Sequence, residues 1–396
     1  MRVLVVTSPW PTHYFVMQPL AGAFRAAGHE VLIAAQASMS DLVTRSGLPM
    51  VAIDGDVDLV GIRRRTLSRE LQAREKPAQA AGGEGNEVFD SWREATLSNL
   101  DSVVEFAGAW LPDLIVADTM SPAGLVAARV LGIPGIRHLW GWDFLGSVEG
   151  EKLLSVLPGF YEPYERYGLK VTGDPATRTV DPCPPSLQPP GSPTRISMQY
   201  VPYNGPGSVP SGLPPRAEGR PRICLTWGRS ITRIIGDKAF LLPQIIRAVD
   251  GIDADFVVAI DPADRDGLGE LPPNVVALDA PPLHLLLDTC DAIVHQGGSG
   301  TVYNAIRYGL PQLAITHMAD QDNISAALEK SGAGIHLRSE EATAEAIRRA
   351  VARLVDDSGI AHAAARLRAE MLSQPAPAQV VAELEQLAAS ASRPRD

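Results

Sequence analysis

The stretch from Asp291 to Thr316 constrains the fold more than any other part of the sequence. An apolar run at 291–294 leads into His295-Gln296-Gly297-Gly298-Ser299-Gly300-Thr301, and a helix-like run at 302–308 is followed by a second apolar run at 312–316. This order predicts a strand, a glycine-rich turn, a helix and a second strand. A βαβ unit of this kind requires a parallel sheet.

The glycine-rich turn predicts an anion site. The first backbone N–H groups of a helix have no partner inside the helix, and the helix dipole favours negative charge at the same place. Glycines let the backbone approach a phosphate closely. His295, at the end of the preceding strand, can add a donor or a positive charge. We therefore expect this turn to hold a diphosphate.

Strand and helix patterns alternate in both halves of the chain. We expect strands at 2–7, 29–35, 49–53, 114–118, 135–139, 222–226, 255–260 and 274–278, besides the two named above. We expect helices at 16–27, 39–46, 95–110, 122–130, 238–248, 283–287, 323–331, 342–355, 360–372 and 378–388. Sustained alternation builds parallel sheets with helices on both faces, so the prediction is an α/β chain of two doubly wound, Rossmann-like domains.

Segments that lack the alternation divide the chain. Residues 54–90, with an arginine cluster at 63–65, predict an exposed or mobile insertion whose arginines form a solvated face. The segment 201–221 is rich in Pro, Gly and Ser and predicts a linker. The expected division is a domain at 1–205, a linker at 206–220, a domain at 221–374 and a last helix within 375–396. Ligands bind beyond the carboxyl ends of strands in such sheets, so we expect the site in a cleft between two facing domains.

Composition limits the kinds of binding partner and the cellular location that we expect for this protein. The 396 residues carry a net charge of −11, which argues against nucleic acid or an anionic membrane as the main partner. The three cysteines show no CxxC spacing, so neither a disulfide framework nor a metal site is expected. The apolar start at 3–6 is too short for a signal peptide, and no apolar run is long enough to span a membrane. We expect a cytoplasmic protein.

His13 and Asp118 are candidates for acid–base chemistry. His13 lies in the expected loop after the first strand, and Asp118 ends the strand at 114–118. If both strands are central, the two side chains can meet at one edge of the sheet. A buried carboxylate on one imidazole nitrogen fixes the tautomer and raises the basicity of the other nitrogen. The alternative is that each residue caps the helix that follows it.

Two polar groups in the second half are candidates for donor binding. Gly228, Arg229 and Ser230 follow the strand at 222–226, where a glycine permits close backbone approach and a serine offers a hydroxyl. Asp320 and Gln321 combine a carboxylate with an amide, which suits the hydroxyls of a sugar. The alternatives are a plain strand-to-helix turn and a solvated loop whose helix is capped by an aspartate at 322.

Aromatic residues in the first half are candidates for acceptor binding. His138, Trp140 and Trp142 cluster after the strand at 135–139 and could wall a flat hydrophobic ligand, although core packing is the alternative. Trp10 and Tyr14, which flank His13 in the sequence, are assigned to the same acceptor set.

These stretches together resemble bacterial antibiotic glycosyltransferases of the GT-B fold, family 1-like. The resemblance rests on Thr12-His13, Asp118, 181–187, 201–207, 225–228, 281–283, 291–301 and 319–321, and it spans nearly the whole chain. Its most specific part is His295 to Gly300 followed by Asp320-Gln321. The family's second histidine is Gln296 here, and Trp227 and Arg229 replace small residues, which leaves donor contacts at those positions open.

The resemblance implies an inverting, metal-independent transfer of a deoxysugar from a TDP- or UDP-sugar to a hydroxyl of a polyketide-type aglycone. No bound cofactor is implied, and a homodimer is possible in this family. His13 would be the general base and Asp118 would orient it. Donor contacts would come from Gly228, Arg229, Ser230, Pro281, Leu283, His295, Gln296, Gly297, Gly298, Ser299, Gly300, Thr301, Asp320 and Gln321, with Pro281 and Leu283 along the nucleobase and Asp320 and Gln321 at the sugar. The last helix would pack back on the N-terminal domain.

Three other functions stay open at this point. One is C-glycosylation of an aromatic polyketide, on which the sequence does not decide. A nucleotide-sugar 2-epimerase would need no aglycone pocket, whereas the aromatic and proline-rich segment 138–187 can form one. A non-catalytic sugar-nucleotide-binding helper would have no use for a base such as His13. A dinucleotide oxidoreductase is disfavoured because no GxGxxG follows the first strand. The identities of sugar and aglycone are not encoded in these motifs.

Overall fold

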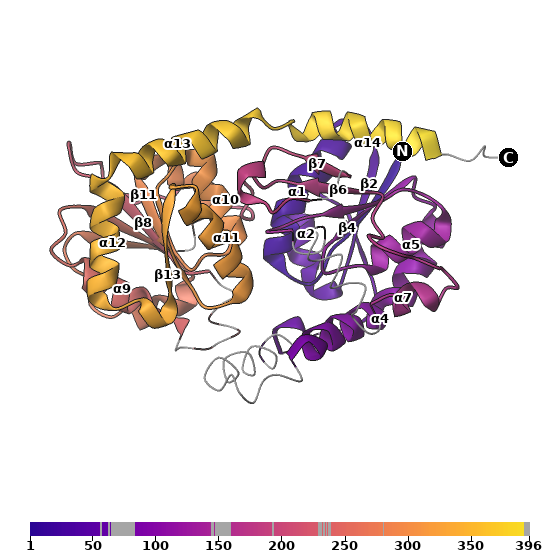
Figure 1. Cartoon of the computed structure of the whole chain (residues 1–396), viewed down its shortest axis with the longest axis horizontal. Coiled ribbons are helices and arrows are strands. Elements are labelled where there is room, and N and C mark those ends of the chain that lie inside the picture. Colours follow the sequence, from indigo (N-terminus) through magenta and orange to yellow (C-terminus); the bar gives the residue numbers. More distant parts are fainter. Residues whose placement is uncertain are drawn as a thin grey trace. The chain divides into compact units, whose positions relative to one another are not determined.

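The computed structural model divides the chain into two compact units (Figure 1). The structure describes residues 1–391 except 56–57, 62–63, 65–83, 144–145, 147–159, 192–193, 229–231, 233, 235, 237–238 and 280. The first unit comprises Met1–Pro182, Pro189–Gln199 and the chain from Gln374 onward, and the second comprises Cys183–Gln188 and Tyr200–Ser373. Within the described residues, no helix is both long and apolar enough to cross a membrane.

The first unit is built on a seven-stranded parallel sheet with the order β3-β2-β1-β4-β5-β6-β7. The strands are β1 (Arg2–Val6), β2 (Glu30–Ala35), β3 (Met50–Ala52), β4 (Leu114–Asp118), β5 (Gly135–His138), β6 (Arg178–Asp181) and β7 (Arg195–Ser197). The chain runs outward from β1 in one direction through β2 and β3, and in the other from β4. The neighbours β1 and β4 therefore flank the point where the strand order reverses, which is where open α/β sheets bind ligands.

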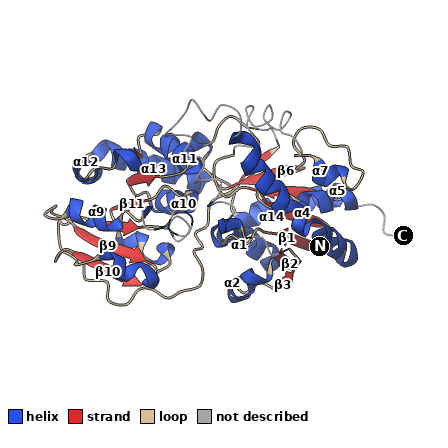
Figure 2. Cartoon of the chain, turned by 90° about the horizontal axis from the view of Figure 1, so that it is seen from below, coloured by secondary structure: helices blue, strands red, loops and turns tan. Residues whose placement is uncertain are grey.

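Helices cover both faces of this sheet (Figure 2). They are α1 (Pro11–Ala26), α2 (Ser40–Arg45), α4 (Glu84–Trp110), α5 (Ala123–Leu131), α7 (Glu162–Glu165) and α14 (Pro377–Ala391), with one-turn helices at Ala37–Met39 and, in the other unit, at Pro185–Leu187. α1 and α14 share one hydrophobic core, whereas α4 and α5 share the other. A hydrogen bond from His29 Nε2 to Glu385 Oε1 (2.7 Å) also ties α14 to this unit.

The second unit repeats the architecture with six parallel strands in the order β10-β9-β8-β11-β12-β13. The strands are β8 (Arg222–Thr226), β9 (Asp255–Ile260), β10 (Val275–Asp279), β11 (Ala292–His295), β12 (Gln312–Thr316) and β13 (Gly334–Arg338). The helices are α9 (Leu242–Val249), α10 (Ser299–Tyr308), α11 (Ala319–Lys330), α12 (Ala344–Asp356) and α13 (Ser358–Ser373), with 3-10 turns at Pro262–Leu268, Leu283–Leu285, Leu287–Thr289 and Ser339–Glu341. Here β8 and β11 flank the reversal of strand order.

Several elements differ from the sequence predictions. β6, β7 and β13 were not predicted, because strands of three to five residues with polar members carry little periodic signal. Helix α4 begins at Glu84, inside the stretch predicted as an insertion. Glycine and asparagine lower the helix propensity of its first turn, so the helical pattern is hard to see there. Most of the arginine cluster at 63–65 lies outside the described residues.

The segment predicted as a linker at 206–220 packs on the second unit. Just before it, buried Tyr200 accepts a hydrogen bond from Asn304 Nδ2 (2.8 Å). Gly207 lies so close to the Pro282 ring that a Cβ would not fit. Arg216 forms an ion pair with Asp291. The proline and glycine content therefore encodes an ordered, extended path over the surface rather than a free tether.

Candidate active site

His13 lies in a helix and not in the predicted loop. Helix α1 begins at Pro11, well before the expected start at residue 16. Proline at the first helical position has no N–H to leave unpaired, and its fixed φ suits a helix, so it starts the helix rather than breaking it. The backbone N–H of His13 bonds to the Trp10 carbonyl (3.0 Å). His13 is therefore held rigidly in the first turn of α1, beside the carboxyl end of β1.

The side chains of His13, Asp118 and Ser8 meet where β1 and β4 end. His13 Nδ1 lies 3.1 Å from Asp118 Oδ2. The same oxygen accepts hydrogen bonds from the Ser8 backbone N–H (3.1 Å) and from the Ser8 hydroxyl. Asp118 Oδ1 accepts from the Met120 backbone N–H (2.9 Å). The parallel register, in which Val6 pairs with Ala117, brings these groups together.

This arrangement keeps Asp118 ionised. Burial alone would raise the pKa of its carboxyl, but the nearby His13 charge and the hydrogen bonds from His13, Met120 and Ser8 outweigh burial and lower the pKa. An ionised carboxylate at Nδ1 assigns the imidazole proton to that nitrogen. The lone pair of neutral His13 then lies on Nε2, which is the form that a general base requires.

Ser8 was missed by the sequence analysis. Like His13, it follows the first strand. Its place at the carboxyl end of a central strand was the sequence feature that could have identified it. A serine after a strand is too common to stand out, and only the fold shows that its hydroxyl reaches both Asp118 and His13 Nδ1 (3.1 Å).

The aromatic residues assigned to the acceptor divide into two groups. The Trp140 ring stacks on the His13 ring, with centroids 4.2 Å apart and planes at 10°. The Trp10 ring also approaches the same imidazole, with the two ring centroids 6.1 Å apart. Trp142 is half-buried. For Trp10, Trp140 and Trp142, acceptor contact stays a prediction.

His138 and Tyr14 are buried, so their assignment to the acceptor site is corrected. The His138 ring donates from Nδ1 to the Leu139 carbonyl (2.8 Å), and burial lowers its pKa to about 4, which keeps it neutral. Tyr14 belongs to the core under α1, and its hydroxyl bonds to Ser46. His138 ends β5, whose four residues are all buried, and Tyr14 lies on the buried face of helix α1. A short aromatic-rich stretch does not show such burial by itself.

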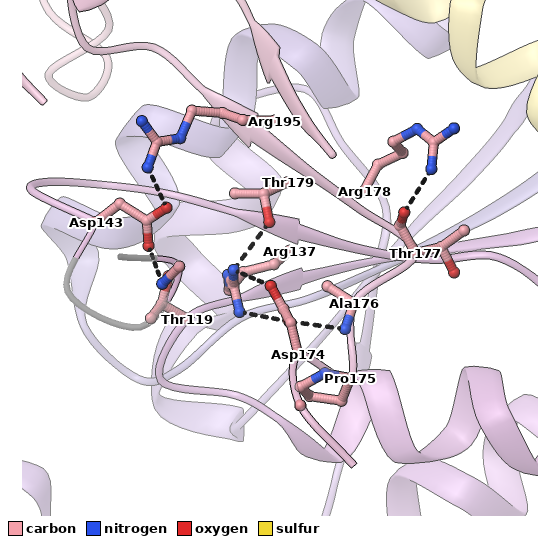
Figure 3. A network of polar contacts seen from close by, with 12 residues as sticks. Thr119, Arg137, Asp143, Asp174, Pro175, Ala176, Thr177, Arg178, Thr179 and Arg195 are labelled. Atoms are coloured by element: carbon pink, nitrogen blue, oxygen red, sulfur yellow. Dashed lines mark hydrogen bonds and ion pairs between the residues drawn. The ribbon is translucent and has the colours of Figure 1, made fainter. Parts of the chain in front are cut away.

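Two ion pairs fix the strands and the loop that carry Trp140 (Figure 3). Arg137 on β5 donates two hydrogen bonds to the Asp174 carboxylate (2.9 and 2.6 Å) and a third to Thr179 Oγ1 on β6 (3.0 Å). Arg195 on β7 donates to Asp143 (2.8 Å), three residues after Trp140. Both arginines are largely buried. The chain after β5 is therefore anchored on either side of Trp140.

In the second unit, His295 is a structural residue. It is fully buried. Its Nε2 lies 3.0 Å from Gln312 Oε1, and its Nδ1 accepts a hydrogen bond from the Gly297 backbone N–H (2.9 Å). Burial lowers the pKa to about 4, against a smaller opposing effect of Gln312. The prediction that His295 offers a donor or a positive charge to phosphate is wrong for this conformation, because both nitrogens are occupied and the ring is neutral.

The glycine-rich turn has the backbone that an anion site needs. Gly297 has φ +83°, and a Cβ there would come within 2.6 Å of Thr316 Cγ2, so only glycine fits. Gly298 is the N-cap of α10, which begins at Ser299 and has no acidic residue in its first turn. A Cβ at Gly300 would meet no atom within 4 Å. The turn therefore presents the positive end of α10 beside open space.

Two members of this turn differ from the simple prediction. The Thr301 N–H bonds to the Gly298 carbonyl (2.9 Å), so Thr301 retains only its hydroxyl for a ligand. The Gln296 amide packs against Gly228, where a Cβ would have to displace it. Its buried Oε1 has no hydrogen-bond partner among the described residues. Arg229 and Ser230 lie outside those residues.

Asp320 and Gln321 lie in the first turn of α11 rather than in a loop. Gln321 is buried, and its Oε1 accepts from the backbone N–H groups of His317 (3.0 Å) and Met318 (3.3 Å). Asp320 is exposed. The alternative N-cap at Asp322 is wrong, because Met318 is the N-cap. Gln321 thus holds the helix start, and sugar contact by either residue stays a prediction.

Pro281 and Leu283 are half-buried and lie on either side of Pro282, where the turn at Leu283–Leu285 begins. Asn204 Oδ1 accepts from the His284 backbone N–H (3.2 Å) and fixes this turn. Contact with a nucleobase stays a prediction.

His317 was also missed by the sequence analysis. It lies between β12 and α11, and its ring lies edge-on to the Trp227 ring with centroids 6.0 Å apart. Trp227 follows β8 and His317 follows β12, and β11 lies between these strands. Burial lowers the pKa of His317 against smaller opposing effects of Glu340 and Asp322. Its Nδ1 has no partner among the described residues.

Family models match both units. Residues 22–228 match the N-terminal domain of the erythromycin biosynthesis protein CIII-like family, and residues 243–387 match its C-terminal domain. The chain belongs to the EryCIII-like glycosyltransferase family. It is therefore a glycosyltransferase, and its two parallel α/β units are those of the GT-B fold.

Relatives match over the whole length. The chain is 36% identical to 10-deoxymethynolide desosaminyltransferase of Streptomyces venezuelae, over 100% of this chain and 99% of that protein. It is 36% identical to aklavinone 7-beta-L-rhodosaminyltransferase of Streptomyces galilaeus, over 98% and 96%.

Two solved structures show the same architecture. The glycosyltransferase VinC in complex with dTDP matches this EryCIII-like chain with TM-score 0.81 and 29% identity, over 98% of this chain and 100% of that one. The spinosyn rhamnosyltransferase SpnG complexed with spinosyn aglycone matches with TM-score 0.78 and 30% identity, over 97% and 100%.

Proposed function

We propose that this protein transfers a deoxysugar, with inversion, from a TDP-sugar to a hydroxyl of a polyketide-type aglycone in antibiotic biosynthesis. The observation that carries the proposal is the buried Ser8–His13–Asp118 cluster at the strand-order reversal of the first unit. A site with an oriented base suits a reaction that begins by taking a proton from a hydroxyl. The named relatives are deoxysugar transferases, which favours transfer over a 2-epimerase or a helper.

The chemistry follows from the lone pair on His13 Nε2. The base takes the proton of the acceptor hydroxyl as the oxygen forms its bond to the anomeric carbon. The bond from that carbon to the diphosphate breaks on the opposite face, and the electron pair leaves with the nucleoside diphosphate. Asp118 stabilises the imidazolium that results. One oriented base of this kind contributes about 10²–10⁴-fold in rate.

The start of α10 is proposed to hold the departing charge. Its unpaired N–H groups and dipole favour a diphosphate, and no carboxylate in its first turn opposes one. We propose that this charge stabilisation needs no metal ion. The TDP choice is supported by the dTDP that VinC holds and the aglycone by the complex of SpnG. The expectations of a cytoplasmic location and of a homodimer stay predictions.

The test is product analysis with one TDP-deoxysugar and a panel of polyketide aglycones. We expect a new glycoside by mass spectrometry, an inverted anomeric configuration by NMR, and equal rates with and without EDTA. A glycoside linked through carbon would favour the C-transfer alternative. A rearranged nucleotide sugar formed without any aglycone would indicate an epimerase, and dTDP binding with no turnover across the panel would indicate a helper.

A further inference from the structure

The Trp140 ring stacks nearly parallel on the His13 ring. The ring planes differ by 10° and the centroids are 4.2 Å apart. Trp140 follows β5, His13 lies on α1, and Asp118 ends β4 between them, so three separate elements converge on one imidazole. Asp118 fixes the edge of the ring at Nδ1 (3.1 Å), whereas Trp140 covers a face.

We propose that Trp140 is a positioning residue for His13: its indole face holds the imidazole in the orientation set by Asp118 and stabilises the imidazolium that forms when the base accepts a proton. This role differs from that of a wall of the acceptor site, the role that the sequence suggested for Trp140. It rests on the proposed function only in taking His13 as the base of the reaction.

The surroundings of Trp140 support this role. Its indole Nε1–H is buried and has no hydrogen-bond partner among the described residues. No hydrogen bond of the indole to the described residues therefore sets its orientation, whereas the parallel stack on His13 is a contact that does. The loop is also held, because Arg195 donates to Asp143 (2.8 Å) (Figure 3), and Thr119 Oγ1 donates to the His138 carbonyl (3.3 Å).

The charges around His13 determine how strongly the aromatic face of Trp140 affects protonation of the imidazole. Among the described residues, groups that contact or approach the ring include the Asp118 carboxylate from β4, the Ser8 hydroxyl after β1, and the rings of Trp10 and Trp140. His138, on β5, is kept neutral by burial and brings no positive charge. An indole face attracts a cation, and most strongly where water is excluded. The indole face of Trp140 therefore stabilises protonated His13 more than neutral His13.

Three variants separate this role from simple packing. Trp140→Leu keeps apolar bulk but removes the aromatic face, whereas Trp140→Phe restores a face. Trp110→Leu removes a half-buried indole at the end of α4 and serves as the matched control. The pKa of His13 is read by NMR titration of its imidazole, which is assigned by comparison with His13→Gln. This measurement does not depend on catalysis.

We expect Trp140→Leu to lower the pKa of His13 by about half a unit to one unit, and Trp110→Leu to leave it unchanged. In transfer assays, Trp140→Leu should lower kcat about tenfold and move the acidic limb of the pH–rate profile to lower pH. Trp140→Phe should recover most of both effects. Thermal unfolding checks that each variant is folded.

Several results would overturn the proposal. One is an unchanged or raised pKa in folded Trp140→Leu, and another is an equal loss of kcat in the Leu and Phe variants. A raised acceptor KM with unchanged kcat would make Trp140 a wall of the acceptor site instead. If Trp140→Leu does not fold, fluorinated tryptophan keeps the ring shape and weakens its negative face, so the pKa of His13 should still fall. If the His13 pKa shifts in Trp140→Leu but the protein makes no glycoside, the proposed function is refuted. The proposed effect of Trp140 on His13 is then still supported.

Discussion

The His295 imidazole is held between Gln312 Oε1, 3.0 Å from Nε2, and the Gly297 backbone N–H, which donates to Nδ1 over 2.9 Å. The histidine that introduces the glycine-rich turn thus shapes the turn instead of reaching out of it. A neutral, fully bonded imidazole links β11, β12 and Gly297, whose positive φ and close neighbours disfavour any side chain. We propose instead that the positive charge an anion needs comes from the N–H groups and dipole at the start of α10.

Gly297→Ala and Gly300→Ala form a matched pair on this turn. Gly297 combines φ +83° with a 2.6 Å approach to Thr316 Cγ2, so alanine there should destabilise the fold by about 2–4 kcal/mol. Gly300 lies in the first turn of α10 with open space at its Cβ, so alanine there should leave stability within about 0.5 kcal/mol. The same methyl group should obstruct a diphosphate. Urea unfolding and dTDP titration check both outcomes, and an intact dTDP affinity in Gly300→Ala would contradict the placement of the diphosphate.

Stability should fall as the pH drops from about 6.5 towards 4. The pKa of both His295 and His138 is lowered from 6.5 to about 4, so in this window the unfolded chain binds protons that the folded chain does not. The sign of the linkage is a loss of stability with falling pH, on the order of 3 kcal/mol for each histidine across the full window.

The slope of unfolding free energy against pH, between pH 7 and 4.5, measures this effect. His295→Gln and His138→Gln should each flatten the slope, whatever their effect on stability at pH 7. Asp118 affects stability at lower pH than the two histidines. The stability from its lowered pKa is present above pH 3.8 and is lost only as the pH falls below that value. A slope that both variants leave unchanged would show that the two histidines titrate freely.

The Ser8–His13–Asp118 cluster predicts a graded series of transfer rates. His13→Ala should lower kcat by about 10²–10⁴-fold. Asp118→Asn should come close to that loss, since an amide does not hold the same tautomer or stabilise the imidazolium. Ser8→Ala removes one of several donors to the carboxylate and should cost about tenfold. All three should bind dTDP as the unmodified protein does, and a fully active His13→Ala would remove the assigned base.

The buried Arg137–Asp174 pair predicts a large effect of one substitution on stability. Asp174→Ala leaves the Arg137 side chain, of which 3% is exposed, without its carboxylate partner, at a cost of about 3–5 kcal/mol. The exposed pair of Arg349 and Glu345 is the control, and Glu345→Gln should change stability by less than about 1 kcal/mol. Chemical unfolding of both variants decides the matter, and equal effects would contradict the burial argument.

The sequence by itself was sufficient for the fold class, because it depends on local patterns that repeat. Valine-rich strands, helices ended by glycine, and the βαβ unit from Asp291 to Thr316 specify parallel sheets wherever they occur. The family resemblance came from short motifs of the same local kind. These features can be identified from the sequence alone, because each depends on residues that are neighbours in the chain.

The tertiary structure decided what individual side chains do. Whether His295 meets a phosphate or Gln312, and whether Tyr14 and His138 face a ligand or the core, depends on burial, which is a property of contacts between distant segments. The role of Ser8 and the stack of Trp140 on His13 likewise require β1, β4 and β5 to lie side by side. A residue's type limits the bonds it can make, but the partners that the fold brings within 3–4 Å determine which of them form.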